Sequence, residues 1–212
     1  MNYSKIKFLD HKGAKGTTKF GGQPDWLKNP EWPVSKATDK PMQFICQINL
    51  EEAGYRNIEA KFAYLFMTED EDEYVDGTWE PDGGENAIIL QPGHNQQKTI
   101  GLANGPFLYK MVKKESAFRL VKEPFECAVE LIASSTENET KTEDVEIVNK
   151  IGGSPYFIQG EEYPTSEKDN WFLLLQLDSV NVPFYVNFGD AGVGYAFLNK
   201  EGNKAKFLWQ CL

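Results

Sequence analysis

The sequence predicts a mainly β fold, or an α+β fold with few short helices, in which two similar halves form one pseudo-symmetric globular unit. Three observations support this prediction. A block of residues occurs twice, the apolar runs are short and are interrupted by turn residues, and helical periodicity is sparse. At 212 residues with 41% hydrophobic content, the chain is long enough to bury a substantial core.

The repeated block is the most direct sign of two similar halves. Lys19–Leu27 reads KFGGQPDWL and Lys150–Ile158 reads KIGGSPYFI. A little further along each copy, Glu31–Pro33 (EWP) is matched by Glu162–Pro164 (EYP) without a gap. Paired glycines and nearby prolines favour a loop, because glycine adopts backbone angles that other residues resist and proline cannot continue a helix. We therefore predict an internal duplication in which each copy begins with a loop.

After the loop, each copy continues with apolar runs of strand length. The first run of each copy contains a glutamine at an equivalent position, Gln47 or Gln176, whose amide must be hydrogen-bonded if it is buried. The large aromatic residue within each loop, Trp26 or Phe157, is expected to be buried beneath that loop. The paired strand candidates are Met42–Ile48 with Trp171–Leu177, Phe62–Thr68 with Phe184–Phe188, and Ala87–Leu90 with Tyr195–Leu198.

The two copies define the expected organisation of the chain. Copy one spans about residues 17–95 and copy two about residues 148–212, and a β-containing segment, 96–147, joins them. Within that segment Phe125–Leu131 alternates apolar residues with polar or small ones, which is typical of a half-buried strand. Leu50–Glu59 is the one segment for which a short helix is expected.

Composition excludes several classes of function. The formal charge of −10 and the pI near 4.8 oppose binding to nucleic acid, for which affinity depends on Lys and Arg. The apolar runs are far shorter than the roughly 20 residues of a membrane span, and residues 1–16 lack the apolar stretch of a secretory signal. Cys46, Cys127 and Cys211 are widely spaced and odd in number, which suits neither a disulfide framework nor a zinc site. We therefore expect a cytoplasmic protein with reduced thiols, no metal or cofactor, and no membrane or nucleic-acid partner.

Most of the chain resembles the YwqG-like family of bacterial domains of unknown function. The block GG-x-P-x-aromatic occurs twice, and the chain closes on Leu208-Trp209-Gln210. The resemblance implies a bacterial, cytosolic, mainly β domain, and it transfers no catalytic residue. The segments that carry the resemblance are Lys19–Pro33, Pro41–Ile48, Thr78–Ala87, Lys150–Pro164 and Gly189–Gln210.

No catalytic or metal-binding constellation is recognisable in the sequence. His11 and His94 have no Cys or His partner at the spacing of a metal site or a catalytic triad. Gly189–Gly194 lacks the G-x-G-x-x-G pattern and is expected to be a turn between strands. The acidic run Glu69–Glu73 does not place ligands at the positions of an EF-hand and is expected to be an exposed loop.

A cleft between the two copies is the expected binding site. The repeated Glu31 and Glu162 suggest a symmetric carboxylate pair, the chemistry of a general acid and base. Tryptophans beside prolines and acids suit a groove, since Trp combines a large apolar face with one donor. The candidate residues of the cleft are Glu31, Trp32, Trp79, Glu85, Asn86, Glu162 and Tyr163.

The expected function is that of a cytosolic, non-enzymatic binding domain, such as an inhibitor or immunity-type partner of a basic protein. Acidic residues concentrate in Glu69–Asp76 and Glu137–Glu146, and such segments steer a cationic partner electrostatically. The alternative is an enzyme that uses the repeated or the loop carboxylates in a cleft between the copies. A buried glutamate with a raised pKa facing an open pocket would favour the enzyme, whereas a broad acidic surface would favour binding.

Overall fold

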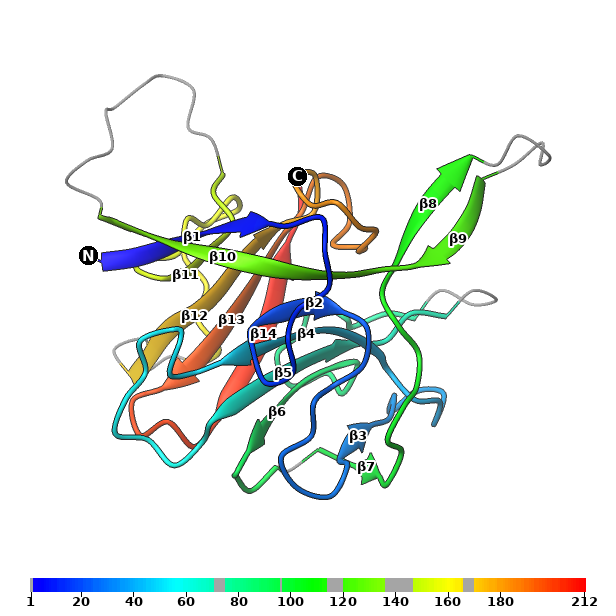
Figure 1. Cartoon of the computed structure of the whole chain (residues 1–212), viewed down its shortest axis with the longest axis horizontal. Helices are drawn as coiled ribbons and strands as arrows, with labels where there is room; N and C mark the ends of the chain where they lie inside the picture. Colours follow the sequence, from blue (N-terminus) through cyan, green and yellow to red (C-terminus); the bar gives the residue numbers. More distant parts are fainter. Residues whose placement is uncertain (1, 71–74, 96, 114–119, 136–146, 166–169) are drawn as a thin grey trace.

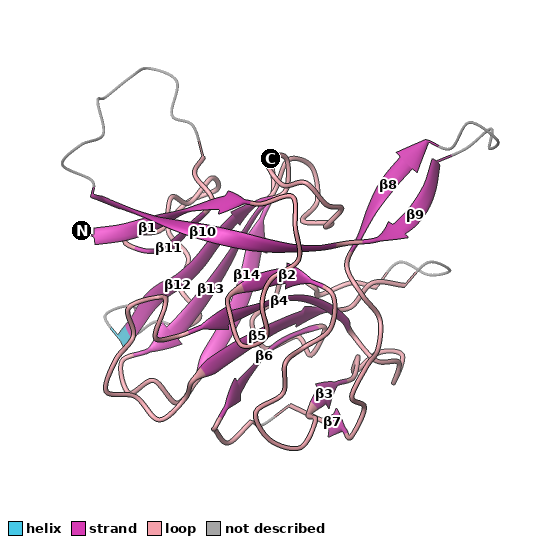
Figure 2. Cartoon of the chain, in the orientation of Figure 1, coloured by secondary structure: helices cyan, strands magenta, loops and turns pink. Residues whose placement is uncertain are grey.

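The structure of the chain is a computed structural model, and it describes all residues except 1, 71–74, 96, 114–119, 136–146 and 166–169 (Figure 1). Among the described residues, strands and loops account for nearly everything, and no α-helix occurs (Figure 2). The mainly β class is therefore confirmed. In the described part of the chain, no helix has the length and apolar character needed to cross a membrane.

Most strands belong to one antiparallel sheet of ten strands. The sheet curls until its two outermost strands, β6 and β14, approach each other, although no hydrogen-bonded ladder joins these two among the described residues. The result is one nearly closed globular unit. In spatial order the strands are β14 (Ala205–Gln210), β13 (Val193–Asn199), β12 (Trp171–Asp178), β11 (Lys150–Gly152), β1 (Asn2–Phe8), β10 (Glu126–Ser135), β2 (Lys19–Gly21), β4 (Gln43–Asn49), β5 (Phe62–Met67) and β6 (Asn86–Gln91).

Two short pairs of strands lie outside this sheet. The pair β3 (Trp32–Pro33) and β7 (Thr99–Ile100) belongs to the loops that cover β4, β5 and β6. The pair β8 (Tyr109–Lys113) and β9 (Leu120–Pro124) forms an arm that projects from the body (Figure 1).

The strand order of the large sheet reads alike from both ends. The series β2, β4, β5 and β6 is mirrored by β11, β12, β13 and β14, and β1 and β10 pair in the middle. Equivalent residues pair in the two series, since Lys19 lies opposite Gln47 and Lys150 lies opposite Gln176. The register also shifts at equivalent places, after Phe44 in β4 and after Leu173 in β12.

Five strands of the two series, β4, β5, β6, β12 and β13, are buried on both faces along most of their length, which explains why they read as continuous apolar runs rather than as alternating ones. One face lines an inner core within the curled sheet, to which Phe20, Leu65 and Phe207 belong. The other face is covered by loops and forms two outer clusters. The first outer cluster contains Trp32, Met42, Phe44, Phe62, Tyr64, Phe66, Ala87 and Ile89, and the second contains Trp171, Leu173, Val193, Tyr195, Phe197 and Leu208.

The paired glycines adopt the left-handed backbone that the sequence predicts for them. Gly21 and Gly22 have φ of +72° and +67°, and Gly152 and Gly153 have φ of +77° and +75°. At Gly21 a Cβ atom would lie 2.1 Å from the carbonyl oxygen of Phe125, so the strands approach closely there only because no side chain is present. Each pair ends its short strand and directs the chain into the covering loop.

Two expectations about secondary structure are wrong. Leu50–Glu59 forms turns and no helix, because Gly54 and Asn57 have φ of +86° and +65°, which break helical geometry. Phe184–Phe188 alternates buried and exposed side chains like a strand, yet it pairs only through a bridge from Tyr185 to Tyr109. Buried and exposed side chains alternate in this segment because every second one packs on the inner core, and not because the segment belongs to a sheet.

The equivalence of the later strands also needs correction. Tyr195–Leu198 does form a strand, within β13, but its register makes it the counterpart of β5 rather than of β6. The counterpart of β6 is β14 at the C-terminal end. Trp26 and Phe157 pack against the outer clusters and are partly rather than fully buried.

Candidate functional site

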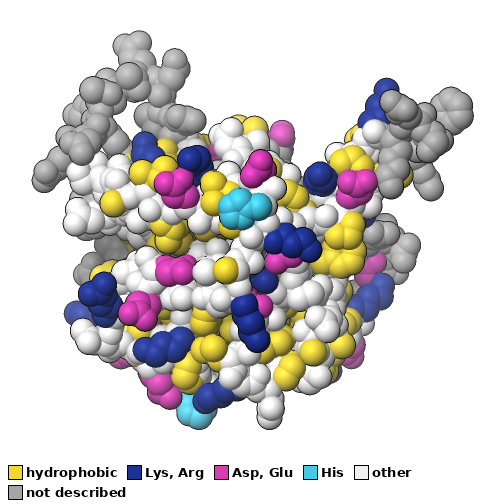
Figure 3. Space-filling view, in the orientation of Figure 1, with side chains coloured by type: hydrophobic (Ala, Val, Ile, Leu, Met, Phe, Trp, Pro, Cys, Tyr) yellow, Lys and Arg dark blue, Asp and Glu magenta, His cyan; other side chains and the backbone are white. Residues whose placement is uncertain are grey.

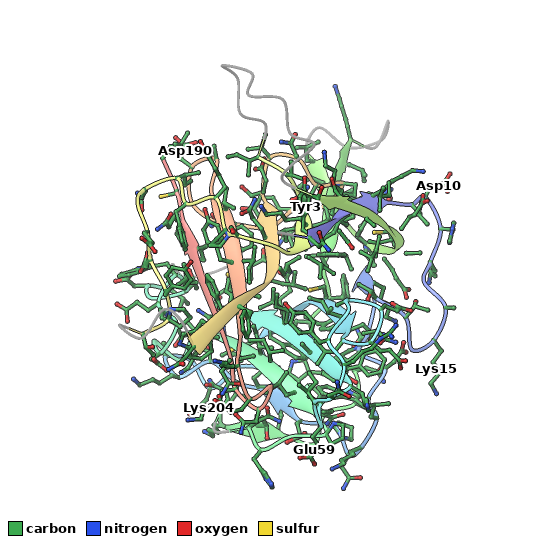
Figure 4. The ribbon with its side chains drawn as sticks, turned by 90° about the vertical axis from the view of Figure 1, so that its left-hand side faces the viewer. Tyr3, Asp10, Lys15, Glu59, Asp190 and Lys204 are labelled. Carbon is green, nitrogen blue, oxygen red and sulfur yellow. The ribbon has the colours of Figure 1, made fainter. Side chains whose placement is uncertain are left out.

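A hollow of about 460 Å³ lies at the seam where the two ends of the sheet approach each other. We call it the seam cleft. One wall comes from β6 and the loops around it, and the other comes from β14 and the turn before it. Glu59 and Lys204, from opposite walls, lie at the same end of the molecule in Figure 4. The polar side chains that line the cleft are Glu59, Asp82, Asn86, His94, Asn95, Gln97, Asn203, Lys204 and Lys206.

The outer edge of β6 is capped by a side chain instead of a further strand. Leu90 donates its backbone N–H to Asn95 Oδ1 at 2.9 Å, and Asn95 Nδ2 donates to the Leu90 carbonyl at 3.2 Å. The amide group therefore occupies the hydrogen-bonding position that a neighbouring strand would use. This cap keeps β14 from pairing with that end of β6, and the cleft lies there.

Charged and polar groups connect the walls of the cleft to their surroundings. Lys206 on β14 forms an ion pair with Asp82 in the loop before β6, and this contact bridges the two halves. Asn86 donates to the carbonyls of Thr78 and Glu80, both at 2.9 Å, and so holds that loop.

Three other side chains of the cleft have no hydrogen-bond or ion-pair partner in the part of the chain that the structure describes, and we call them uncommitted. Glu59, His94 and Lys204 are exposed and make no side-chain hydrogen bond or ion pair to any described residue. One carboxylate, one imidazole and one ammonium group are therefore available to a ligand. No hydrogen bond or ion pair joins these three described side chains to one another.

The first repeated glutamate belongs to the loop that covers the first half. Gln91, fully buried at the end of β6, accepts hydrogen bonds from the backbone N–H groups of Leu27 and Lys28 at 3.1 and 3.3 Å. Its amide nitrogen donates to the Asn29 carbonyl and to Glu31 Oε2 at 3.1 and 2.7 Å. Glu31 is thus one of several acceptors and donors that fix this loop.

The second repeated glutamate makes the same contacts in the second half. Gln210 at the end of β14 accepts from the backbone N–H groups of Ile158 and Gln159, both at 3.1 Å. Its amide nitrogen donates to the Gly160 carbonyl and to Glu162 Oε2, both at 3.0 Å. The repeated glutamates therefore do not form a symmetric carboxylate pair, because each is bound to the glutamine of its own half.

The predicted aromatic residues do not gather at one groove. Trp32 is fully buried in the first outer cluster, where its Nε1 donates to the Met42 carbonyl at 2.8 Å. Tyr163 packs its ring on Phe157 and Phe197 in the second half. Trp79 is 41% exposed but does not line the seam cleft. Trp32 is therefore a core residue, because its large ring fills the space between the covering loop and β5.

Glu85 is a buried carboxylate whose hydrogen bonds are satisfied. Its oxygens accept from Ser35 Oγ at 2.7 Å, from the Ala37 backbone N–H at 2.8 Å and from Thr68 Oγ1 at 2.8 Å. A carboxylate held by three donors stabilises the loop that supplies two of them and is not free to accept a proton from a substrate.

A smaller hollow of about 150 Å³ lies toward the other end of the seam. Trp209 of β14 lines it together with Thr68 and Glu69, which follow β5. The Nε1 atom of Trp209 is buried and has no acceptor among the described residues. Trp209 therefore brings to this hollow a buried N–H donor whose hydrogen bond is not satisfied.

The acids beside the smaller hollow are already paired with lysines of the chain. Glu69 accepts from Tyr109 Oη and from Lys122 Nζ, the latter at 3.1 Å. Asp70 binds Lys40 Nζ at 2.6 Å. Burial, and then the hydrogen bond to Glu69, raises the pKa of Tyr109 above its usual range. The start of the first acidic segment is thus largely neutralised, and residues 71–74 and 137–146 of the acidic segments lie outside the described residues.

Two of the three thiols are poorly suited to act as nucleophiles because they are buried. All three cysteines are free, and Cys46 and Cys127 are buried. Burial raises the pKa of the Cys46 thiol well above its ordinary value and that of Cys127 to about 11. Both thiols stay protonated near neutral pH, and a protonated thiol is a poor nucleophile. Within the described residues, no group of three or more His, Cys, Asp or Glu side chains is arranged to hold a metal ion.

Of the seven residues predicted for the cleft, only Asn86 lines the seam cleft. The sequence reasoning missed Glu59, His94, Lys204 and Lys206. These residues come from three separate segments, and no spacing or motif connects those segments. Only the approach of β6 to β14 brings them together.

Comparison with protein families gives one match. A family model described as a domain of unknown function, DUF1963, matches residues 18–211. No curated protein matches the chain in a sequence search. The matched range contains both halves of the sheet and both walls of the seam cleft.

Proposed function

The chain belongs to the DUF1963 family of domains of unknown function, and because this membership assigns no activity, we propose from the geometry that the protein is a non-enzymatic binding domain. The proposed site is the seam cleft. The observation that carries this proposal is a hollow of about 460 Å³ between the two halves, in which Glu59, His94 and Lys204 are uncommitted. A concave site with a few free polar groups is typical of a place where another molecule binds.

The contacts of the predicted carboxylates favour binding over acid–base chemistry. A general base must reach the proton that it removes and must be free to accept it. Glu31 and Glu162 are bound to the amides of Gln91 and Gln210, and Glu85 is held by three donors. None of the three lines the seam cleft. The repeated glutamates and Glu85 are therefore not in position to act as a general base in the seam cleft.

The proposed partner is a protein with a basic surface, which the domain would bind as an inhibitor or an immunity-type partner. The formal charge of −10 supports this choice, because opposite net charge accelerates the encounter of two proteins. Asp10, Glu59 and Asp190 are exposed and lie at different edges of the molecule (Figure 4). Acidic groups that could attract such a partner are therefore not confined to one loop of the described chain.

The finer family relation is part of the same proposal. The resemblance to YwqG-like domains is carried by the two GG-x-P-x-aromatic blocks and by the closing Leu208-Trp209-Gln210. We assign the protein on this ground to a bacterial cytoplasm. Fractionation of the native cell tests the location, and a membrane or extracellular location would contradict it.

A pair of histidine variants tests the binding proposal. His94→Trp places a large side chain in the seam cleft, and His11→Trp makes the same change at an exposed site outside the cleft. Wild-type protein and both variants are immobilised at low salt and exposed to the native cytosol. We expect a basic protein to be retained by the wild type and by His11→Trp, and to be lost or strongly reduced with His94→Trp.

Association kinetics then separate a steered encounter from an incidental one. The rate of association with the retained protein is measured from about 0.01 to 1 M salt, a range over which the Debye length falls from about 30 to 3 Å. Electrostatic steering predicts a rate that falls by about 10- to 10³-fold. Equal retention by His94→Trp, or a rate indifferent to salt, would contradict the proposal.

A further inference from the structure

The arm formed by β8 and β9 belongs to a two-stranded sheet of its own. It projects away from the curled sheet (Figure 1). Its base is fixed by Tyr109, whose ring stacks on Tyr185 at 5.3 Å and whose hydroxyl donates to Glu69. Beyond Tyr109, the two strands pair only with each other among the described residues. A hairpin of two strands is marginally stable in water unless something else packs on it.

Apolar side chains of the arm are left in solvent. In an antiparallel pair, residues directly opposite each other share a face, so Met111 lies beside Lys122, and Leu120 lies beside Lys113. Met111 and Leu120 are 42% and 52% exposed. The opposite face carries Val112 and Val121, a further apolar pair. An arm with exposed apolar groups on a narrow protrusion is typical of a surface that docks on something else.

The charge of the arm is opposite to that of the rest of the chain. β8 and β9 hold three lysines and one glutamate, whereas the other residues that the structure describes hold 15 Lys and Arg against 20 Asp and Glu. Lys110 and Lys113 form no ion pair with any described residue. Lysine and hydrophobic side chains gather on the described part of the arm in Figure 3.

We propose that this arm is a self-association element that docks on the acidic body of a second copy of the chain. Charge complementarity selects this partner, because the basic arm of one copy meets the acidic body of the other while two arms would repel each other. A reciprocal exchange of arms gives a closed dimer with twofold symmetry, in which both arms are used. Docking would bury Met111 and Leu120 and so remove the apolar surface that the isolated chain exposes. The seam cleft takes no part in this contact.

Sedimentation velocity of the full-length protein tests the proposal at concentrations from about 1 µM to 1 mM. This range covers the dissociation constants of weak to moderately stable dimers. The wild type is expected to dimerise at low salt. Met111→Glu/Leu120→Glu is expected to weaken dimerisation by at least about tenfold, because it replaces the docking groups with charges that match the acidic partner surface. The matched control is Ile132→Glu/Phe172→Glu, which changes residues that are 43% and 48% exposed on the body and should leave the dimer intact.

A charge variant tests the choice of partner. Lys110→Glu/Lys113→Glu should dissociate the dimer at low salt, and added salt should weaken the wild-type dimer in the same direction. His94→Trp should leave dimerisation unchanged, so a failure of the seam-cleft proposal does not affect this test. A wild type that stays monomeric over the whole range, or a dimer unaffected by the arm variants, would overturn the proposal. A monomer that binds duplex DNA only when Lys110 and Lys113 are present would instead assign the arm to nucleic acid.

Discussion

In the first half of the molecule, Gln91 on β6 holds the loop of residues 22–34, and in the second half Gln210 on β14 holds the loop of residues 153–165 through equivalent atoms. A tyrosine anchors each loop from the neighbouring strand. Tyr64 Oη donates to the Asp25 carbonyl at 2.8 Å, and Tyr195 Oη donates to the Tyr156 carbonyl at 2.7 Å. We propose that the two halves are copies of one unit, since mirrored strand order alone would not require the same side-chain contacts.

The covering of the two loops differs. In the first half the segment of residues 97–106 adds a second layer, because Gln23 and Gly105 exchange two hydrogen bonds and Trp26 Nε1 donates to the Ala103 carbonyl. The described part of the second half has no such layer. Phe172 on β12 is 48% exposed, whereas Gln43, at the same position of β4, is buried. The comparison shows that the hydrogen bonds from Gln91 and Gln210 to the loops are common to both halves, while the segments that cover the loops and strands differ.

The largest expected difference between the halves concerns the ring at the end of each loop. Trp32→Ala should destabilise the protein by about 3–5 kcal/mol, because it removes a fully buried ring and leaves a cavity. Tyr163→Ala should have a clearly smaller effect, since Tyr163 is partly exposed. Urea unfolding of both variants measures the difference. Equal midpoints for the two variants would show that the coverings do not differ in energy.

Substitution of the two glutamines, unlike that of the two rings, should destabilise the protein by equal amounts in the two halves. Gln91→Leu and Gln210→Leu each leave two loop N–H groups without their acceptor, so each should destabilise by about 1–3 kcal/mol. Hydrogen exchange of the amides of Leu27 and Lys28, and of Ile158 and Gln159, should accelerate only in the half that was changed. A large effect at one glutamine and none at the other would contradict the proposal of two equivalent copies.

The buried thiols of Cys46 and Cys127 predict that the protein loses stability at alkaline pH. In an unfolded chain a thiol ionises near pH 9.0, whereas burial raises the pKa of Cys127 to about 11. The folded state therefore holds more protons between these values, and the free energy of unfolding should fall as the pH rises from about 9 to 11. Cys46→Ala/Cys127→Ala should flatten this part of the profile. An unchanged slope would mean that the thiols are not the cause.

The ion pair across the seam should have the smallest effect. Lys206 and Asp82 are partly exposed, and such pairs contribute about 0–1 kcal/mol. Lys206→Ala should therefore lower the urea midpoint slightly at low salt and not at high salt, where the charges are screened. A larger decrease in the urea midpoint, or one that does not depend on salt, would mean that Lys206 contributes to stability by packing rather than by charge.

Several features of the fold are predictable because they depend on short stretches of sequence. The left-handed glycine pairs, the strand character of β4 and β12, and the hydrogen-bonded glutamines Gln47 and Gln176 follow from local chemistry and are present in the structure. The false helix at Leu50–Glu59 shows the limit of this approach. Its apolar residues contact the core through turns, and nothing in their spacing reveals that difference.

The candidate site was much less predictable. Trp32 and Glu85 looked like groove residues from their acidic and proline-rich surroundings, yet both are buried by segments distant in sequence. Phe184–Phe188 alternates like a strand because its side chains face the inner core, and periodicity cannot reveal whether a partner strand is present. His94 and Lys204 carried no signal, because each is an isolated residue in a turn.

The sequence by itself determined the mainly β class, the two loop-and-strand blocks and the absence of a disulfide framework, because backbone preference, apolar run length and cysteine spacing act over short distances. Only the tertiary structure decided which strands pair, which rings are buried and where a cleft lies. Those outcomes depend on how the sheet curls and how near β6 comes to β14. Contacts of that kind join residues more than a hundred positions apart, such as Asp82 and Lys206, and no local pattern encodes them.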